Sequence, residues 1–216
     1  MIELLHMDCM EYMAGLPDKA FDLAIVDPPY GIGNWVQISG NVRGDAVTWN
    51  DAIPPPEYFA EVRRVSSKQV IWGANYYNCF NGNGGALVWN KHMPRESNMS
   101  VCEVASLSWV KRVDYVDLKW QNINRCEATV HPCQKPVALY RWLLQNYAKP
   151  GDRILDTHLG SGSIAIACDI EGFDLVGCEI DADYIAAARK RLADHHSQPR
   201  LFEEQPRQEA EQLKLA

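Results

Sequence analysis

The chain has 216 residues, of which 47% are hydrophobic and 23% charged, and its formal net charge is −7. This much apolar sequence excludes an intrinsically disordered chain. No apolar run of about 18 residues occurs, so no membrane-spanning segment is expected. The negative charge, taken alone, argues against nucleic acid as a partner. The length predicts one domain, and acids in place of bases near the N-terminus give no expectation of a secretory signal.

Apolar runs separated by turn residues predict strands that alternate with helices. The predicted strands cover residues 2–5, 21–26, 69–72, 86–89, 101–110, 153–155 and 174–178. The predicted helices cover residues 10–14, 57–65, 137–147, 163–171 and 181–195. Residues 31–56 and 111–130 are predicted to be irregular. This order predicts an α/β fold with a mostly parallel central sheet and helices on both faces. A single domain of residues 1–196 is followed by a polar tail, residues 197–216.

The charge is unevenly distributed along the chain. Residues 1–30 carry one base and six acids, whereas residues 31–130 carry 10 bases and 9 acids. The bases of this middle segment form three clusters among Asn, Tyr and Trp residues: Arg63, Arg64 and Lys68; Lys91, His92 and Arg95; Lys111, Arg112 and Lys119. Each cluster alone is also typical of a solvated surface. The middle of the chain is therefore compatible with an anionic partner.

The seven cysteines predict free thiols, buried or half-buried. Their number is odd, their spacing is wide and no CxxC pair occurs, so a zinc site is not expected. This cysteine usage is typical of a reducing cytoplasm. His195 and His196 lie in polar sequence without a matching set of ligands, and we interpret them as surface residues.

A glycine-rich turn between a strand and a helix predicts a nucleoside site. Gly160, Gly162 and Ala165 fit the pattern G-x-G-x-x-A, and Glu179 follows 17 residues after Gly162, at the end of the next strand. A carboxylate in that place can accept hydrogen bonds from ribose hydroxyls. A G-x-G pattern alone is equally typical of a tight turn. The complete order of strand, turn, helix, strand and acid favours the nucleoside.

Asp156, just before this turn, bears on the choice between two cofactors. NAD would bring a pyrophosphate to the start of the helix, where Asp156 would repel it. S-adenosylmethionine brings an ammonium and a sulfonium, which suit a carboxylate. The sequence therefore favours the methyl donor, with NAD remaining open.

The sequence Asp27-Pro28-Pro29-Tyr30 ends an apolar run and predicts a second chemical site at a strand end. An amine conjugated to a base ring is a poor nucleophile, and acceptors that bind its hydrogens improve it. The Asp27 carboxylate and the Pro28 carbonyl supply two such acceptors, and the prolines stiffen the backbone between them. Tyr30 offers a flat face for a base taken out of its helix. A turn with no chemistry is the alternative interpretation.

The segment FDLAIVDPPYG, residues 21–31, resembles the catalytic motif of amino-group DNA methyltransferases, which methylate adenine N6 or cytosine N4. The catalytic motif precedes the cofactor loop, an order that resembles the β-class of this family. Residues 131–136 resemble its HPxQKP motif, residues 176–179 its ribose-binding strand, and Asp8 with Cys9 its GD-C motif. The similarity extends over about residues 2–192 and includes four motifs in order.

The resemblance implies a Rossmann-like, S-adenosylmethionine-dependent methyltransferase fold and methylation of N6 of a flipped adenine in double-stranded DNA. The implied catalytic residues are Asp27, Pro28, Pro29 and Tyr30. The residues implied to bind S-adenosylmethionine are Asp8, Cys9, Asp27, Gln134, Lys135, Asp156, His158, Gly160, Ser161, Gly162, Ser163, Glu179 and Ile180. The residues expected to meet DNA, from recognition loops at about 31–52 and 90–130, are Trp49, Tyr76, Lys91, His92, Arg95, Lys111 and Arg112.

Further expectations follow from the same resemblance. No metal is expected, because the sulfonium is already a good leaving group. A homodimer resembles common β-class behaviour. The short chain, with no separate recognition domain, resembles adenine methylases of phages, which implies the cytoplasm of a bacterial or phage-infected cell.

The sequence also departs from the family pattern. Thr157 and His158 replace Pro and Phe of the cofactor loop, Ser163 replaces Thr, and Met7 replaces the Gly before Asp8. Asp27 favours adenine, because cytosine-N4 enzymes of this layout more often carry Ser there. The alternatives are cytosine, RNA adenine or a protein glutamine as the methyl acceptor. A catalytically silent nucleoside-binding module also stays open.

Overall fold

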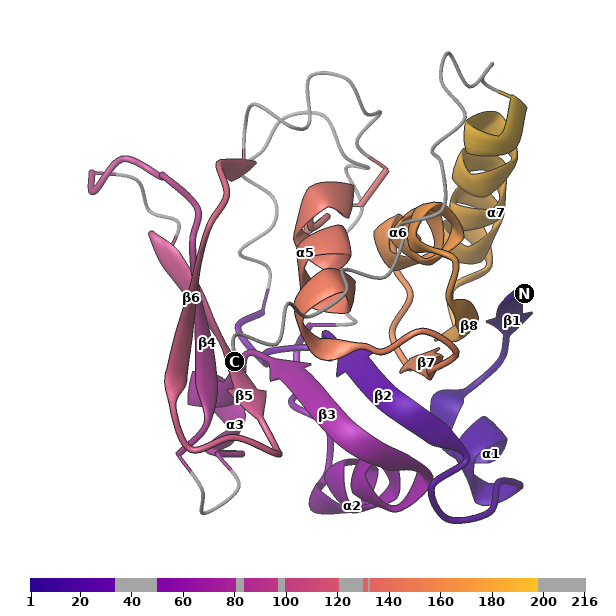
Figure 1. Ribbon diagram of the computed structural model, residues 1–216, viewed down its shortest axis with the longest axis horizontal. Helices are drawn as coiled ribbons and strands as arrows, with labels where there is room; N and C mark the ends of the chain where they lie inside the picture. The colour runs from indigo at the N-terminus through magenta and orange to yellow at the C-terminus, as the bar shows by residue number, and fades with distance from the viewer. Residues whose placement is uncertain (34–49, 81–83, 97–99, 121–129, 132, 198–216) are drawn as a thin grey trace, which may run out of the picture.

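The computed structural model describes residues 1–33, 50–80, 84–96, 100–120, 130–131 and 133–197 (Figure 1). Trp49, most of the predicted loop 31–52, part of the predicted loop 90–130 and the tail after residue 197 lie outside these residues. Within the described ranges, no helix has the length and apolar character needed to cross a bilayer.

Eight strands of the described residues form one sheet in the order β1-β8-β7-β2-β3-β5-β4-β6. Five of its seven strand pairs are parallel, and β5 runs antiparallel to its neighbours β3 and β4. The strands are β1 (Ile2–His6), β2 (Phe21–Val26), β3 (Ser66–Trp72), β4 (Ala86–Asn90), β5 (Cys102–Leu107), β6 (Val113–Asp117), β7 (Arg153–Asp156) and β8 (Asp174–Glu179). The mostly parallel α/β sheet predicted from the sequence is confirmed.

Helices cover both faces of this sheet (Figure 1). One face carries α5 (Val137–Tyr147), α6 (Ser163–Glu171) and α7 (Ala182–Ser197), and the other carries α1 (Cys9–Ala14) and α2 (Pro56–Val65). Strand β2 feeds both cores because successive side chains point to opposite faces. Leu23 and Ile25 pack in the core under α5 and α6, whereas Ala24 and Val26 pack in the core under α1 and α2.

Two short elements differ from the sequence prediction. Strand β6 lies inside residues 111–130, which are predicted to be irregular. It is an edge strand that pairs only with β4, and Val113 and Tyr115 are 63% and 56% exposed, so it lacks the continuous apolar run of a central strand. The four-residue helix α3 (Ala74–Tyr77) is too short for a periodic pattern to indicate it.

The six described cysteines are free thiols, as predicted. Cys79, Cys168 and Cys178 are buried, whereas Cys102 and Cys133 are exposed, contrary to the expected burial. Cys102 is the first residue of β5, and Cys133 lies in the connection before α5, so neither is inside a packed element.

The connections of the sheet locate the position where a ligand would bind. From β2 the chain passes through α2 to β3, and from β7 it passes through α6 to β8, so it leaves these two neighbouring strands in opposite directions and over opposite faces. Open α/β sheets bind ligands at such a switch point, beyond the carboxyl ends of the strands. Asp27 follows β2 and Asp156 ends β7, so both carboxylates lie at this point.

Candidate active site and cofactor pocket

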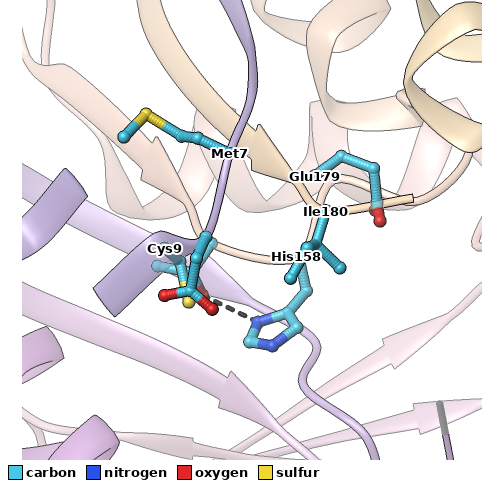
Figure 2. A pocket seen from close by; sticks show the side chains of 7 residues that line it. Met7, Cys9, His158, Glu179 and Ile180 are labelled. Carbon is cyan, nitrogen blue, oxygen red and sulfur yellow. Dashed lines mark hydrogen bonds between the residues drawn. The ribbon is translucent and has the colours of Figure 1, made fainter. Parts of the chain in front are cut away.

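A small pocket opens at the carboxyl ends of β1, β7 and β8 (Figure 2). Its lining residues are Met7, Asp8, Cys9, Thr157, His158, Glu179 and Ile180. Asp8 also caps helix α1, because its Oδ1 accepts hydrogen bonds from the backbone N–H groups of Met10 at 2.7 Å and Glu11 at 3.2 Å. Five of the residues predicted from the sequence to bind the cofactor therefore line one pocket: Asp8, Cys9, His158, Glu179 and Ile180.

Glu179 holds the glycine-rich turn against this pocket. One carboxylate oxygen accepts from the Gly160 N–H at 2.8 Å and the other from the Asp181 N–H at 2.9 Å. Gly160 and Gly162 have φ angles of +50° and +73°, which favour glycine. A Cβ atom on Gly162 would also lie 2.8 Å from the Cβ of Ala188 on α7. The turn is therefore fixed from two sides, by Glu179 at Gly160 and by Ala188 against Gly162.

Arg191 of α7 supports the same turn from behind. Its guanidinium is buried and donates to the Ser161 carbonyl and to the Ser163 Oγ, the latter at 3.2 Å. Ser161 and Ser163 are buried and lie 3.1 Å apart at their hydroxyls. These two residues, predicted to bind the cofactor, thus form the base of the turn. Arg191 is missed by sequence reasoning because an arginine in an amphipathic helix ordinarily indicates a solvated face.

Asp156 is a buried carboxylate with no ion-pair partner among the described residues. It is 1% exposed, and its Oδ1 accepts one hydrogen bond, from the His158 N–H at 3.0 Å. Burial raises the pKa of Asp156 to about 8, and the neighbouring carboxylates add to this effect. A cation beside Asp156 would restore the charged form. The residue therefore fits a ligand that brings a positive charge.

His158 is an uncharged ring at the wall of the pocket. Burial lowers its pKa to about 4, so the imidazole is neutral at pH 7. Its Nδ1 lies 3.0 Å from the Thr157 Oγ1, the contact drawn in Figure 2, and its ring meets the edge of Tyr58 at 5.3 Å between centroids. A neutral imidazole is flat, as the Phe of the resembled family pattern is, but its nitrogens are polar and Nδ1 meets the Thr157 hydroxyl. The departure at this position therefore keeps a flat uncharged ring and adds polar atoms.

The carboxyl end of β2 carries a compact polar cluster around Asp27. The Tyr30 hydroxyl donates to Asp27 Oδ1 at 2.6 Å, and the Lys135 ammonium pairs with Oδ2. Lys135 also donates to the Tyr30 hydroxyl at 3.3 Å. Lys135 is only 4% exposed at its side chain, and Asp27 is 17% exposed. Lys135 therefore belongs to the Asp27 cluster, although the sequence predicts it as a cofactor ligand.

The carbonyl groups of both prolines meet one tyrosine. The Tyr77 hydroxyl donates to the carbonyl of Pro28 and, at 2.9 Å, to that of Pro29. Asn50 accepts the Tyr30 N–H at 2.8 Å, so side chains from α3 and from the loop before α2 both fix the turn. The two carbonyls are thus held in place by bonds that no sequence motif indicates.

The ring of Tyr30 is enclosed on two sides. It stacks on Tyr76 with centroids 4.9 Å apart and planes 18° apart. On another side it lies against Gly73, where a Cβ atom would come within 2.4 Å of the ring. Tyr76, predicted to meet DNA, is 39% exposed and covers the face of Tyr30 that the sequence assigns to a base.

Two further predicted residues lie in places the sequence does not indicate. Lys91 is 5% exposed and pairs with Glu103 at 2.7 Å, so it lies inside the site and not on a DNA-facing surface. Gln134 is 2% exposed, and its Oε1 accepts the Val130 N–H at 3.1 Å. Gln134 therefore shapes the chain before α5 and lies outside the lining of the pocket.

The exposed basic residues expected to meet DNA lie at opposite ends of the neighbouring strands β4 and β6. Strand β6 runs parallel to β4, with Val113 opposite Ala86. Lys111 and Arg112 precede β6 and so lie at the amino ends of these strands, whereas His92 and Arg95 follow the carboxyl end of β4, on the side of the site. The sequence does not indicate this separation, because it predicts residues 111–130 to be irregular and so gives no position for β6; the contacts of these four residues with DNA stay a prediction.

The comparisons with known proteins agree with this arrangement. Residues 37–190 match the N6/N4 methyltransferase family model, described as DNA methylase. The Type II methyltransferase M2.DpnII of Streptococcus pneumoniae is 26% identical over 165 residues, which cover 76% of this chain and 56% of that protein. The DNA adenine methyltransferase YhdJ of Escherichia coli is 24% identical over an alignment 270 residues long, which includes 92% of this chain and 85% of that protein.

Solved structures show the same fold. The crystal structure of the M1.HpyAVI–SAM complex has a TM-score of 0.57 and 24% identity, and the alignment covers 88% of this chain and all of that chain. The cytosine-N4-specific PvuII DNA methyltransferase has a TM-score of 0.61 and 10% identity, with 90% of this chain and 91% of that chain covered. These likenesses confirm the Rossmann-like methyltransferase fold. Because the family model matches more than half of the chain, the chain belongs to the N6/N4 family of DNA methylases.

Proposed function

We propose that this chain transfers a methyl group from S-adenosylmethionine to the N6 amino group of an adenine in double-stranded DNA. The observation that carries the proposal is that two aspartates, Asp27 and Asp156, lie at the ends of the neighbouring strands β2 and β7. One carboxylate is paired with a lysine, and the other is buried without a cation. The first suits a neutral amine and the second a positively charged donor.

The residues of the pocket fit S-adenosylmethionine by their chemistry. This cofactor supplies a methyl group on a sulfonium, which leaves as a neutral thioether. Glu179 offers carboxylate oxygens to ribose hydroxyls, and His158 offers a neutral ring beside the pocket. Asp156 offers the buried negative charge that a sulfonium or ammonium needs. Arg191 keeps the glycine-rich turn in the shape that lets backbone approach the ligand.

Asp27 Oδ1 and the Pro28 carbonyl are the proposed acceptors for the two hydrogens of the target amine. Bonds from both hydrogens draw the nitrogen lone pair out of conjugation and improve the nucleophile. In the structure these oxygens already accept from the hydroxyls of Tyr30 and Tyr77. Both donors are neutral hydroxyls, and Tyr77 keeps its bond to the Pro29 carbonyl when an amine takes its place at Pro28. The Lys135 ammonium stays on Oδ2, the oxygen that the target amine does not use.

An adenine reaches these acceptors only when it leaves the duplex, because its amine is otherwise paired. The Tyr30 ring is the proposed stacking surface, and Tyr76 must move away from it for a base to enter. Orienting the amine toward the methyl group then provides much of the rate, since proximity alone contributes several kcal/mol. His92 and Arg95 lie at the same edge of the sheet and are the proposed contacts to DNA phosphates.

The test is methylation of unmethylated genomic double-stranded DNA with tritiated S-adenosylmethionine, followed by mass spectrometry of the nucleosides. We expect label in N6-methyladenine, and loss of at least about 100-fold in turnover for Asp27→Ala with donor binding retained. Asp22→Asn is the matched control, because Asp22 lies on the same strand at its opposite end and is exposed. Label in N4-methylcytosine, in RNA or in protein would contradict the assignment of the substrate.

A further inference from the structure

Four charged side chains form a chain of contacts behind the proposed amine acceptor. Asp27 Oδ2 pairs with Lys135, Lys135 pairs with Glu103 Oε2 at 3.1 Å, and Glu103 Oε1 pairs with Lys91 at 2.7 Å. Side-chain exposure is 4% for Lys135, 6% for Lys91 and 18% for Glu103. Two negative and two positive charges cancel within the cluster. Such balance matters because an unpaired buried charge is strongly destabilising.

Three oxygens surround the Lys135 ammonium. It donates hydrogen bonds to Asp27 Oδ2 and, at 3.3 Å, to the Tyr30 hydroxyl, and it forms an ion pair with Glu103 Oε2. Burial lowers the pKa of Lys135, but the two carboxylates outweigh burial and raise it above its ordinary value. The ammonium is therefore charged and held from two sides, by the proposed amine acceptor and by Glu103.

Glu103 lies on β5, the strand of the described sheet that runs antiparallel to its neighbours. It lies near the start of β5, opposite Trp89 of β4, and so stands at the edge where the parallel strands end. Burial raises the pKa of Glu103, but Lys135 and Lys91 outweigh burial and lower it. Among the described contacts, Glu103 touches both lysines but neither Asp27 nor the pocket.

We propose that Glu103 is a positioning residue that holds Lys135 on Asp27 Oδ2 and keeps Lys91 away from Asp27, so that Oδ1 remains for the target amine. The inference rests on the proposed function. It assigns Glu103 an action through two lysines, and no contact with substrate or donor. Activity then depends on how the two lysines are shared between Asp27 and Glu103 more than on any single ion pair.

Replacing Glu103 by Gln tests this division. Two buried ammonium groups would then share one carboxylate, and Asp27 would be occupied at both oxygens by cations. A neutral amine competes poorly with an ammonium for a carboxylate oxygen. We expect kcat to fall about 10- to 100-fold, with KM for S-adenosylmethionine within about threefold of the unmutated chain. Glu171→Gln is the matched control, since Glu171 pairs with Arg141 at 2.7 Å, far from the site at the end of α6.

A double variant separates charge balance from packing. Lys91→Met together with Glu103→Gln removes one charge of each sign and leaves Lys135 paired with Asp27. We expect kcat of the double variant to return to within about fivefold of the unmutated chain. A merely structural Glu103 predicts the opposite, because two packing defects in contact would make the double variant at least as slow as the single one. That result would overturn the proposal.

A second readout needs no turnover. Acetic anhydride labels lysine amines in proportion to their accessibility and free-base fraction, and mass spectrometry of peptides locates the label. Lys135 and Lys91, which both lose a partner, should be protected in the unmutated chain and labelled several-fold faster in Glu103→Gln, with the other lysines unchanged. Equal labelling of Lys135, or an unchanged kcat, overturns the role of Glu103. Absence of methyl transfer to DNA by the unmutated chain contradicts the proposed function instead, and leaves the labelling result to decide on Glu103.

Discussion

Replacing Asp156 by Asn should stabilise the free protein and at the same time weaken donor binding. Asp156 is buried, and burial raises its pKa from the ordinary 3.8 to about 8. A carboxyl whose pKa is higher in the folded state favours folding when it is protonated, below pH 4. Its contribution is lost progressively as the pH rises toward 8, because the unfolded chain then releases the proton more readily.

The magnitude follows from the same pKa values. The difference between 3.8 and about 8 corresponds to about 6 kcal/mol of destabilisation above pH 8. An Asn side chain removes this charge but leaves amide hydrogens to satisfy, at a cost of about 1–3 kcal/mol. A net gain of about 3 kcal/mol at pH 9 corresponds to a rise in Tm of roughly 6–12 °C for a chain of this size. At pH 5 most of this gain should be absent.

Differential scanning calorimetry of both proteins at pH 5 and pH 9 measures the gain, and titration with S-adenosylmethionine measures binding. We expect donor affinity of the unmutated chain to fall about tenfold for each pH unit below 8, since the binding form carries a charged Asp156. The Asn variant should bind at least tenfold more weakly at pH 9 and show a flat pH profile. A variant with a lower Tm at both pH values, or with unchanged affinity, would refute the reasoning.

Two further predictions concern the cofactor turn. Gly162→Ala should lower the free energy of unfolding by about 1–3 kcal/mol, because its φ of +73° and the nearby Ala188 both oppose a Cβ atom. Urea unfolding measures this loss, and Gly172→Ala is the control, because Gly172 also has a positive φ but lies in open space. Equal losses in the two variants would contradict a clash with Ala188. His158→Phe should bind S-adenosylmethionine within about threefold of the unmutated chain by calorimetry, because His158 is neutral at pH 7; a loss of tenfold or more would assign the imidazole nitrogens a specific role.

The sequence predicts the parts of the site that lie at ends of parallel strands. Asp27, Asp156 and Glu179 each follow or end an apolar run, so their place on one edge of the sheet follows from the fold class alone. The motif resemblance adds Lys135 but not its partner. That Lys135 meets Asp27 depends on the path of the chain before α5, which no local pattern indicates.

Glu103 and Arg191 are missed for a different physical reason. The edge of the site is formed by the carboxyl ends of the parallel strands, but β5 is antiparallel, so its beginning arrives there instead. A search of strand ends therefore passes over Glu103. Arg191 sits in a helix with charged neighbours, and only the close packing of α7 on the glycine-rich turn buries it. Both residues depend on contacts between elements far apart in the sequence.

The two strand-end aspartates differ in the charge around them, and this difference indicates which ligand each one takes. Asp27 is neutralised within the chain by Lys135, so a second cation would gain little there, whereas a neutral amine needs only a free lone pair. Asp156 has no such partner among the described residues and has a raised pKa, so a cation gains a full ion pair. The proposed amine acceptor, Asp27, and the proposed cation acceptor, Asp156, therefore follow neighbouring strands at the switch point. A methyl transfer from a sulfonium to an amine requires both kinds of acceptor. Removing the lysine partner of Asp27, or placing a cationic side chain beside Asp156, should therefore abolish the reaction and leave the fold intact.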